Sequence, residues 1–239
     1  MGLLSKVVRD DSVTADKDVV GGQGKNFKAP SDVYEMTIEY AYETESKSGA
    51  IGLVLKLVNE AVEHIETLWV QGKNGQNYWE RDGKRNYIPG FTAANDLARL
   101  TLDLEISEVE SEERVIELYD FDKKAKVPVT VSMLDALVGE TVVVAIKQAK
   151  EDSYNKPTES RLSSSIAKFF QADTKRTVEE CIAGIEEGAF VDAWLAQHKG
   201  VIDDKRELSK GEVEGSTAGN AEAAPKKSFF GKKKETSEE

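Results

Sequence analysis

The sequence predicts a mainly β fold with added helices, and three observations lead to this prediction. Segments in which apolar and polar residues alternate, as in half-buried strands, follow one another in the first third of the chain. A β-branched run at 140–149 indicates a buried central strand. Two short helical patterns follow residue 173. This order fits a five-stranded barrel with an inserted helix, and a generic α+β sheet fits it nearly as well.

The first three strands are expected at 32–42, 50–58 and 62–70. In the first of them the alternation places the larger apolar side chains on one face of the strand: Tyr34, Met36, Ile38, Tyr40 and Tyr42. The second strand places Ile51, Leu53, Leu55 and Leu57 on one face. The short links between the three segments favour an antiparallel meander.

The middle of the chain continues with a short helix at 92–100 and two segments that could pair as a hairpin, 114–120 and 126–131. Pro128 should place the second of these at a sheet edge or outside the sheet. The segment SSSIAKFFQ is expected to be a strand that returns to the sheet. Thr177 and Glu180 have the spacing of a capping box and should open a helix.

The 239 residues are expected to fall into four regions. A flexible N-terminal arm covers 1–31, and the main domain covers 32–172. A helical extension covers 173–204, including the helical pattern AFVDAWLAQHK. The tail 205–239 is rich in Ser, Gly, Ala, Glu and Lys and is expected to be disordered.

Composition excludes several classes of protein. The formal net charge is −12, and no apolar run is long enough to cross a bilayer, so a cytoplasmic protein is expected. A single cysteine, Cys181, excludes a disulfide framework. His64 and His198 lie far apart, and the nucleotide-binding and hydrolase motifs are absent, so neither an enzyme, a cofactor nor a metal is expected. Asp120 and Asp122 could bind Mg²⁺ but fit a hairpin turn better.

The segment 69–91 combines flat rings with cations in an otherwise acidic chain. Unpaired bases stack on aromatic rings, and Lys or Arg side chains follow the phosphates, so this combination is typical of single-stranded nucleic-acid binding. The expected binding residues are Trp69, Lys73, Tyr78, Trp79, Arg81, Lys84, Arg85, Tyr87 and Phe91. Lys147 and Lys168 are weaker candidates on later strands. The structural alternative is a loop whose rings fill the core and whose charges are merely solvated.

The C-terminal sequence KKSFFGKKK gives a second signal. Phe229 and Phe230 lie among five lysines in a polar tail, where they cannot form a core. Such a pair is typical of a short motif that docks in a partner's pocket, and contact with lipid or nucleic acid is an alternative.

Four segments resemble a family of bacteriophage single-stranded DNA-binding proteins: LLSKVVRDDSV, SDVYEMTIEYAY, NYWERDGKRNYIPGFTAANDL and FFQADTKRTVEE. The resemblance covers roughly residues 1–200. It implies an OB-type barrel, no enzymatic activity, and a role in replication, recombination and repair of phage DNA in the infected cell. Many such proteins end in an acidic tail with a terminal aromatic residue. In this chain the Phe pair lies among lysines, with Glu235, Glu238 and Glu239 beyond it.

Two other functions remain open on the sequence. A protein-interaction adaptor would recruit a polymerase or another replication partner through Phe229 and Phe230. A metal-dependent nuclease would use Glu45 and Lys47, although no upstream acidic strand completes its motif.

Overall fold

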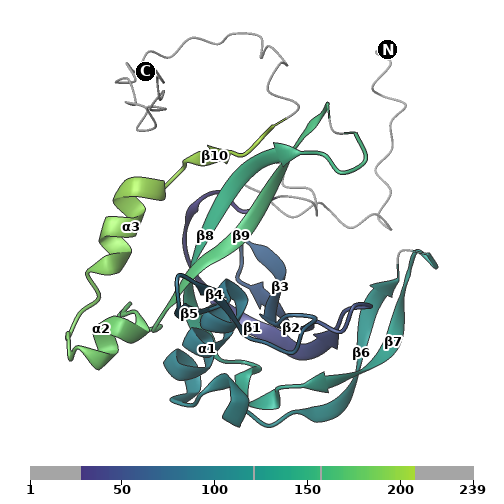
Figure 1. Cartoon of the computed structure of the whole chain (residues 1–239), viewed down its shortest axis with the longest axis horizontal. Coiled ribbons are helices and arrows are strands. Elements are labelled where there is room, and N and C mark those ends of the chain that lie inside the picture. The colour runs from purple at the N-terminus through teal and green to yellow at the C-terminus, as the bar shows by residue number, and fades with distance from the viewer. Residues whose placement is uncertain (1–27, 121, 157, 208–239) are drawn as a thin grey trace, which may run out of the picture.

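The computed structural model of the chain describes residues 28–207 apart from residues 121 and 157 (Figure 1). The strands are β1 (Asp32–Glu45), β2 (Ile51–Val58), β3 (Glu63–Gln71), β4 (Tyr78–Arg81), β5 (Lys84–Tyr87), β6 (Glu112–Asp120), β7 (Ala125–Met133), β8 (Thr141–Asp152), β9 (Ser160–Phe170) and β10 (Ile202–Asp204). The helices are α1 (Pro89–Leu102), α2 (Val178–Ile182) and α3 (Phe190–His198), with 3-10 turns η2 (Ile106–Glu108) and η3 (Asp135–Leu137). The mainly β prediction is therefore confirmed.

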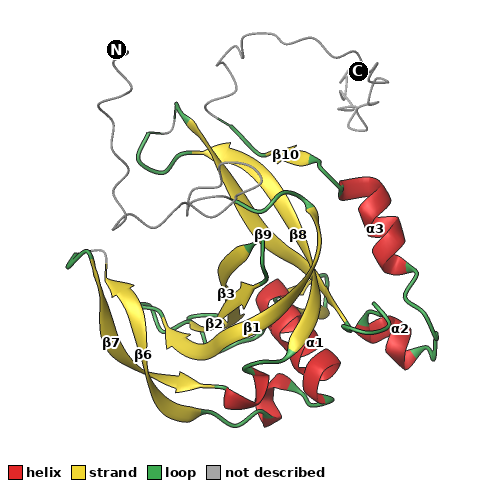
Figure 2. Ribbon diagram, turned by 180° about the vertical axis from the view of Figure 1, so that it is seen from behind, coloured by secondary structure: helices red, strands yellow, loops and turns green. Residues whose placement is uncertain are grey.

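Eight strands form one large sheet, which is antiparallel except where β10 runs parallel to β8. The pairing order is β10-β8-β1-β2-β3; β9 also pairs with β8, and β7 joins β6 to β1. Strands β4 and β5 form a separate two-stranded sheet. The β6–β7 hairpin projects as an arm on one side of the molecule, and α2 and α3 lie on the other (Figure 2).

The sheet has eight strands rather than the predicted five, and it does not close into a barrel. The strands β3-β2-β1-β8-β9 follow one another, but β3 and β9 form no ladder that would close the ring. Instead the Glu66 carboxylate on β3 accepts a hydrogen bond from the Ile166 backbone N–H on β9 at 2.7 Å. His64 also lies 3.0 Å from this carboxylate. Between β3 and β9, hydrogen bonds of the Glu66 side chain stand in place of a backbone ladder. The periodicity of the sequence cannot reveal such a contact.

The main core lies between the inner faces of β1, β2 and β8 and helix α1. Its fully buried side chains include Ile38, Leu55, Leu97 and Phe169. A second cluster lies on the other face of β8, where Val143 and Phe170 meet Val191 and Trp194 of α3. Because β8 is covered on both faces, its β-branched residues from Val142 to Ile146 are all buried, and the prediction of a central strand is confirmed.

A bulge in β1 reverses which of its side chains face the core. Ile38 pairs with Leu57, but Tyr40 pairs with Lys56, so one extra residue is inserted between them. Beyond the bulge Ala41 is buried, whereas Tyr40 and Tyr42 turn to the outer face. The prediction of one continuous face from Tyr34 to Tyr42 is therefore wrong, because a one-residue insertion moves every later side chain to the opposite face.

Chain segments at both ends of the expected main domain pack onto it. In the predicted N-terminal arm, residues 28–31 lie against β8 and β9: the Ser31 hydroxyl accepts from Gln148 N at 2.8 Å, and Ala29 is buried. Past β10, Lys205 N donates to Lys150 O at 2.9 Å. The capping box opening α2 is confirmed, since Thr177 Oγ1 accepts from Glu180 N. The rest of the predicted arm and tail lies outside the described residues.

Candidate nucleic-acid interface

None of the five rings predicted between positions 69 and 91 is buried in the core. Trp69 is 44% exposed, Trp79 46% and Tyr87 60%, while Tyr78 and Phe91 are half-buried. The structural alternative, in which these rings fill the core, is therefore wrong. The rings lie on three elements, however: Trp69 is on β3, Phe91 is on α1, and the others are on the β4–β5 hairpin.

Trp69 lies against a glycine of the neighbouring strand. Gly52 is its register partner, and a Cβ added there would lie 3.0 Å from the indole ring. A side chain at position 52 would therefore push the ring away from the sheet. Because Gly52 has no side chain, one side of the indole can pack against its backbone. Trp69 is 44% exposed, so the rest of the ring is open to solvent.

The β4–β5 hairpin has two chemically different faces. On one face Arg85 lies 4.8 Å from the Tyr78 ring centre and 3.3 Å from Glu80, and Tyr87 stacks with Phe91 at 4.7 Å. The Tyr78 and Tyr87 rings of this face are therefore already partly covered by other side chains of the protein. The register places Trp79 on the other face, and the residues that share this face are Arg81, Lys84 and Asn86. Trp79 thus presents an open ring beside two cations.

The predicted cations differ in whether a carboxylate already neutralises them. Within the described residues, Lys73 and Lys84 make no ion pair, whereas Arg81 lies 3.6 Å from Asp82. Exposed pairs of this kind contribute about 0–1 kcal/mol, so a phosphate could displace the carboxylate.

The two weaker candidates, Lys147 and Lys168, each form an ion pair with a neighbouring element. Lys147 lies 2.7 Å from Asp203 of β10, and Lys168 lies 2.8 Å from Asp96 of α1. Lys168 therefore fixes β9 to the helix, and Lys147 fixes β8 to β10. Neither is a free cation, so the structure does not support them as phosphate contacts.

Sequence reasoning missed Tyr40 and Tyr42, which it had assigned to the core face. Their ring centres lie 5.6 Å apart, and Lys56 Nζ lies 5.8 Å from the Tyr40 ring. Partial burial raises the pKa of both phenols, which are therefore neutral at physiological pH and do not repel phosphate. The only sequence signal for this placement is the small residue Ala41 between the two tyrosines.

The two tyrosines and Trp69 share one face of the sheet. Tyr42 pairs with Val54, and Val54 pairs with Thr67, so these three side chains point to the same side. Trp69 is two residues beyond Thr67 and points the same way. We name this surface, comprising Tyr40, Tyr42, Lys56 and Trp69, the aromatic face. Burial lowers the Lys56 pKa, but hydrogen bonds and charge from Glu39 and Glu63 outweigh this and raise it, so Lys56 stays charged.

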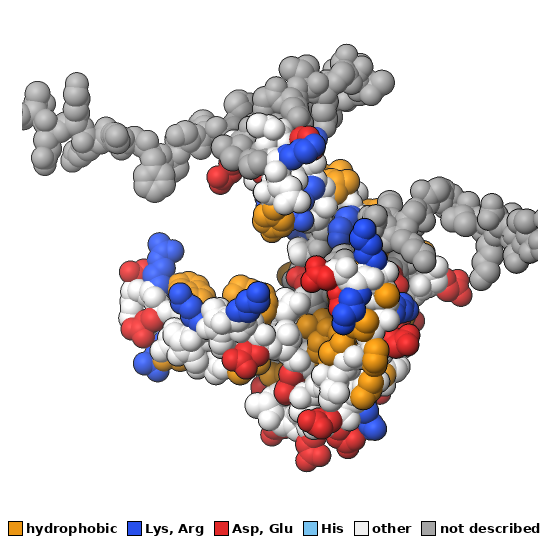
Figure 3. All heavy atoms as spheres, turned by 90° about the vertical axis from the view of Figure 1, so that its right-hand side faces the viewer, with side chains coloured by type: hydrophobic (Ala, Val, Ile, Leu, Met, Phe, Trp, Pro, Cys, Tyr) orange, Lys and Arg blue, Asp and Glu red, His pale blue; other side chains and the backbone are white. Residues whose placement is uncertain are grey.

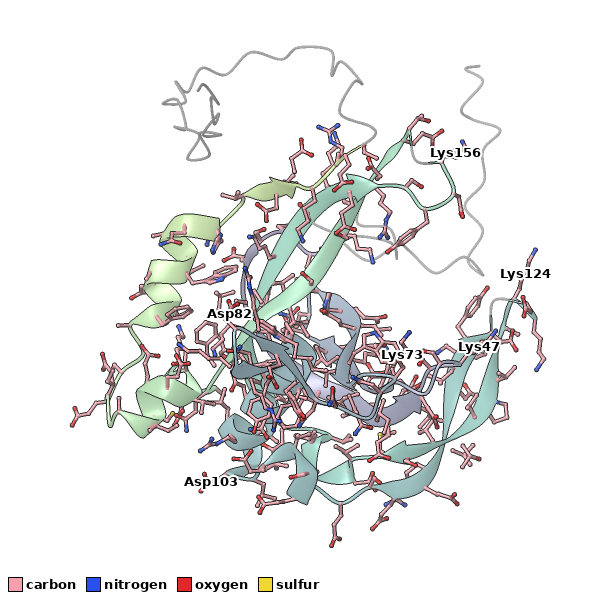
Figure 4. All side chains as sticks on the ribbon, viewed as in Figure 1. Lys47, Lys73, Asp82, Asp103, Lys124 and Lys156 are labelled. Carbon is pink, nitrogen blue, oxygen red and sulfur yellow. The ribbon has the colours of Figure 1, made fainter. Side chains whose placement is uncertain are left out.

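Lysines from separate turns lie on the same side of the molecule. In the view of Figure 4, Lys47 of the β1–β2 turn and Lys73 lie on the right-hand side, below Lys124 at the tip of the arm and Lys156 at the tip of the β8–β9 loop. Asp82, at the tip of the β4–β5 hairpin, lies on the opposite side of that view. Figure 3 shows a hollow between two projections of the molecule, with hydrophobic and basic side chains together below it.

The remaining candidates take structural roles or lie elsewhere. Asp120 Oδ1 accepts backbone N–H groups of residues 122 and 123, which is a turn closing the β6–β7 hairpin. These bonds hold the pKa of Asp120 below its usual value. Among the residues that the structure describes, no cluster of His, Cys, Asp and Glu could hold a metal ion, and no helix is long and apolar enough to cross a membrane. Phe229 and Phe230 lie outside the described residues.

Neither a protein-family model nor a curated protein matches the chain.

Proposed function

We propose that the protein binds and protects single-stranded DNA, largely independently of sequence, during replication, recombination and repair of phage DNA in the cytoplasm of the infected cell. The observation that carries this proposal is the exposure of Trp69 and Trp79, of which Trp79 shares its hairpin face with Lys84, a lysine that makes no ion pair within the described residues. Bases of single strands stack on aromatic rings while cations follow the phosphates, so single-stranded DNA is the ligand that flat rings with nearby cations suit best.

An OB-like, partly open barrel is the architecture that we propose for this function. The five consecutive strands β3-β2-β1-β8-β9 curve around the main core. Along the chain, the β4–β5 hairpin and then α1 follow β3. OB folds are five-stranded and partly open, and they bind oligonucleotides on the outer face of the sheet. The aromatic face occupies the corresponding outer surface of β1, β2 and β3.

The charge distribution supports a preference for single strands over duplex. The chain carries a net charge of −12, so most of its surface repels DNA. A duplex carries one charge per about 1.7 Å along its axis and offers no unstacked bases to the rings. A single strand can gain about 1–3 kcal/mol from each stacked base, which offsets the repulsion. We propose no catalytic step: the protein would act by covering the strand.

The test is a pair of titrations with fluorescently labelled oligo-dT and a duplex of equal length, followed by anisotropy at fixed salt. The proposal predicts saturable binding of oligo-dT that is at least tenfold tighter than binding of the duplex. Equal affinity for both, or no binding, would overturn it. Mg²⁺-dependent shortening of the oligonucleotide would instead indicate a nuclease.

A protein-interaction adaptor is the second candidate, and the Phe pair among lysines in the tail favours it. Removal of residues 208–239 separates the two functions. An adaptor loses its partner when the tail is removed, whereas a DNA-binding protein keeps its affinity for oligo-dT.

A further inference from the structure

A groove between α1 and α2 has no role in the proposed DNA interface. It lies at the C-terminal end of α1, on the α2 side of the molecule (Figure 2), with a volume of about 590 Å³. Its apolar wall consists of Leu100, Leu102, Val178 and Ile182, and Ile182 is 69% exposed. Polar side chains of α1 and of the segment between β9 and α2 line the rest: Arg99, Thr101, Asp103, Gln171 and Arg176. We name this surface the α1–α2 groove.

The guanidinium of Arg176 lines this groove without a carboxylate to neutralise it. Its Nε and Nη2 donate to Gln171 Oε1 at 3.2 and 2.8 Å, its Nε also to Thr174 Oγ1 at 2.9 Å, and its Nη1 to the Ile185 carbonyl at 3.0 Å. All of these acceptors are neutral, and Arg176 makes no ion pair within the described part of the chain. A guanidinium has five N–H groups, so each terminal nitrogen keeps one N–H for a further acceptor. Arg176 therefore offers charge and hydrogen-bond donors to an anion.

The Gln171 amide adds donors at the same place. Gln171 Oε1 accepts hydrogen bonds from Arg176, from Thr174 Oγ1 at 2.7 Å and from Cys181 Sγ at 3.7 Å. Its Nε2 donates no hydrogen bond among the residues that the structure describes. The oxygen is thus engaged inside the protein, and the amide nitrogen is the group left for a ligand.

The groove itself is positive, although the chain that flanks it is acidic. Its lining carries two arginines against one aspartate, Asp103. Arg99 lies 3.4 Å from Glu105, which does not line the groove, so Arg176 is the cation left for a ligand. Three exposed carboxylates of the flanking chain also lie outside the lining: Glu179, Glu186 and Glu187. These repel a polyanion such as DNA, whereas a ligand with a single carboxylate can pair with Arg176.

We propose that the α1–α2 groove binds the carboxyl-terminal segment of a partner protein whose last residues are apolar, with the terminal carboxylate on Arg176 and the apolar side chains against the wall. Such a segment joins one negative charge to apolar side chains, which is the combination that the groove complements. The aliphatic wall has no ring on which a base could stack, so a peptide suits it better than a nucleic acid. This interaction does not depend on the proposed DNA binding.

The test varies the charge of the ligand and leaves the protein unchanged. The probe is N-acetyl-alanyl-valyl-leucine with a free carboxyl terminus, and the control is the same peptide with a carboxamide terminus. Each is titrated into the full-length protein and followed by NMR. The free acid should shift the Arg176 Nε–H and Ile182 methyl signals saturably. The carboxamide should bind about fivefold more weakly or worse, because hydrogen bonds to a charged acceptor are stronger. Equal affinity, or no shift in α2, would overturn the proposal.

Substitutions test which side chains hold the peptide. Arg176→Gln should abolish the preference for the free acid. Lys175→Gln is the matched control and should retain it, because Lys175 is exposed and does not line the groove. If Arg176→Gln unfolds, Ile182→Asp is the second variant: its position is exposed, and it should weaken binding of the free acid about tenfold or more. Unchanged affinity in folded Ile182→Asp would contradict the assigned wall.

Cys181, the single cysteine of the chain, lines the groove and gives a second measurement on the wild type. The free acid should slow the reaction of this thiol with a disulfide reagent in proportion to its occupancy, and an unchanged rate would overturn the proposal. Inorganic phosphate tests the apolar part of the contact. If phosphate protected the thiol as well as the peptide does, the groove would be a site for small anions, and the proposed peptide ligand would be wrong.

Discussion

At the scale of single residues, the proposed interface depends on rings that the fold keeps outside the core. Trp69 is held against Gly52, and Trp79 lies beside Arg81 and Lys84 on one face of its hairpin. The third tryptophan, Trp194, is buried between α3 and β8 and has no route to a ligand on these faces. Two of the three tryptophans are therefore exposed, as the proposed stacking requires, and the third is buried.

Trp69→Ala and Trp79→Ala should each weaken binding of oligo-dT by about 1–3 kcal/mol, which is roughly 5–150-fold in the dissociation constant. Both side chains are nearly half exposed, so their removal should leave the midpoint of thermal unfolding within a few degrees of the wild type. Trp194→Phe is the matched control and should retain affinity. If either alanine variant binds as tightly as the wild type while folded, that ring is not in the interface.

At the scale of elements, close backbone contacts position the site. Helix α1 begins beside β3, and a Cβ on Gly90 would lie 2.2 Å from the Trp69 carbonyl oxygen. Only glycine allows the helix to approach the strand that carries Trp69 so closely. The sequence predicts this helix from its leucine spacing, but nothing in the spacing shows which strand it touches.

Gly90→Ala should therefore destabilise the protein, because the backbone of β3 cannot move away as a flexible side chain could. The expected loss of unfolding free energy is about 3 kcal/mol, at the upper end for overpacking. Thr92→Ala in the same helix is the control, since Thr92 is exposed. Thermal unfolding followed by circular dichroism measures both. An unchanged midpoint for Gly90→Ala would contradict the close approach.

The α2–α3 unit depends on one carboxylate. Burial of Glu180 opposes its charge, but hydrogen bonds from the backbone N–H groups of Thr177, Phe190 and Ala189 outweigh this desolvation and lower its pKa. A lowered folded-state pKa means that this contribution to stability is present above the unfolded-state pKa of about 4.3. It is lost as the pH falls through the folded-state pKa.

Glu180→Gln should lower the unfolding free energy by about 1–3 kcal/mol at pH 7, since hydrogen bonds to a charged acceptor are replaced. The difference from the wild type should shrink as the pH falls below the unfolded-state pKa of about 4.3 and through the lowered folded-state pKa, where the wild-type carboxyl becomes protonated. Urea unfolding at several pH values measures this, with exposed Glu179→Gln as control. A difference that does not change with pH would show that the charge of Glu180 is not what stabilises the unit.

The sequence predicts some elements of the structure and not others, and the difference has physical reasons. Strands β1, β2, β3 and β8 are predicted because their side chains alternate or are β-branched, and α2 because of its capping box. The bulge in β1 is not predicted, because the alternation of apolar and polar residues in the sequence continues without a break to Tyr40 and Tyr42. Likewise, the ion pair of Lys168 with Asp96 joins residues far apart in sequence, which spacing cannot reveal.

At the scale of the whole molecule, the proposed DNA binding requires a few lysines to attract DNA against a net charge of −12. Lys47, Lys73 and Lys124 come from three separate turns and lie on one side of the molecule (Figure 4), whereas Lys156 on that side is paired with Glu159 at 2.8 Å. Local positive charge of this kind can guide a polyanion to one face even when the protein as a whole is acidic. Binding should therefore be sensitive to salt, with a slope set by the number of lysines that contact phosphate.

Affinity for oligo-dT should fall linearly with salt on a double-logarithmic plot, by about 0.7 in slope for each phosphate contact. Lys73→Ser and Lys84→Ser together should reduce the magnitude of the slope by about 1.4 if both contact phosphate. Lys205→Ser, at the β10 end of the molecule, is the control and should leave the slope unchanged. An unaltered slope in the double variant would remove both lysines from the interface.

The most direct measurement of the central claim is the intrinsic tryptophan fluorescence during titration with oligo-dT, compared between the wild type and a Trp69→Phe, Trp79→Phe variant. Stacking of bases on the two exposed indoles predicts strong, saturable quenching in the wild type. The variant retains only buried Trp194 and should show almost none. Equal quenching in both proteins, or binding without quenching in the wild type, would contradict the claim that Trp69 and Trp79 contact the strand.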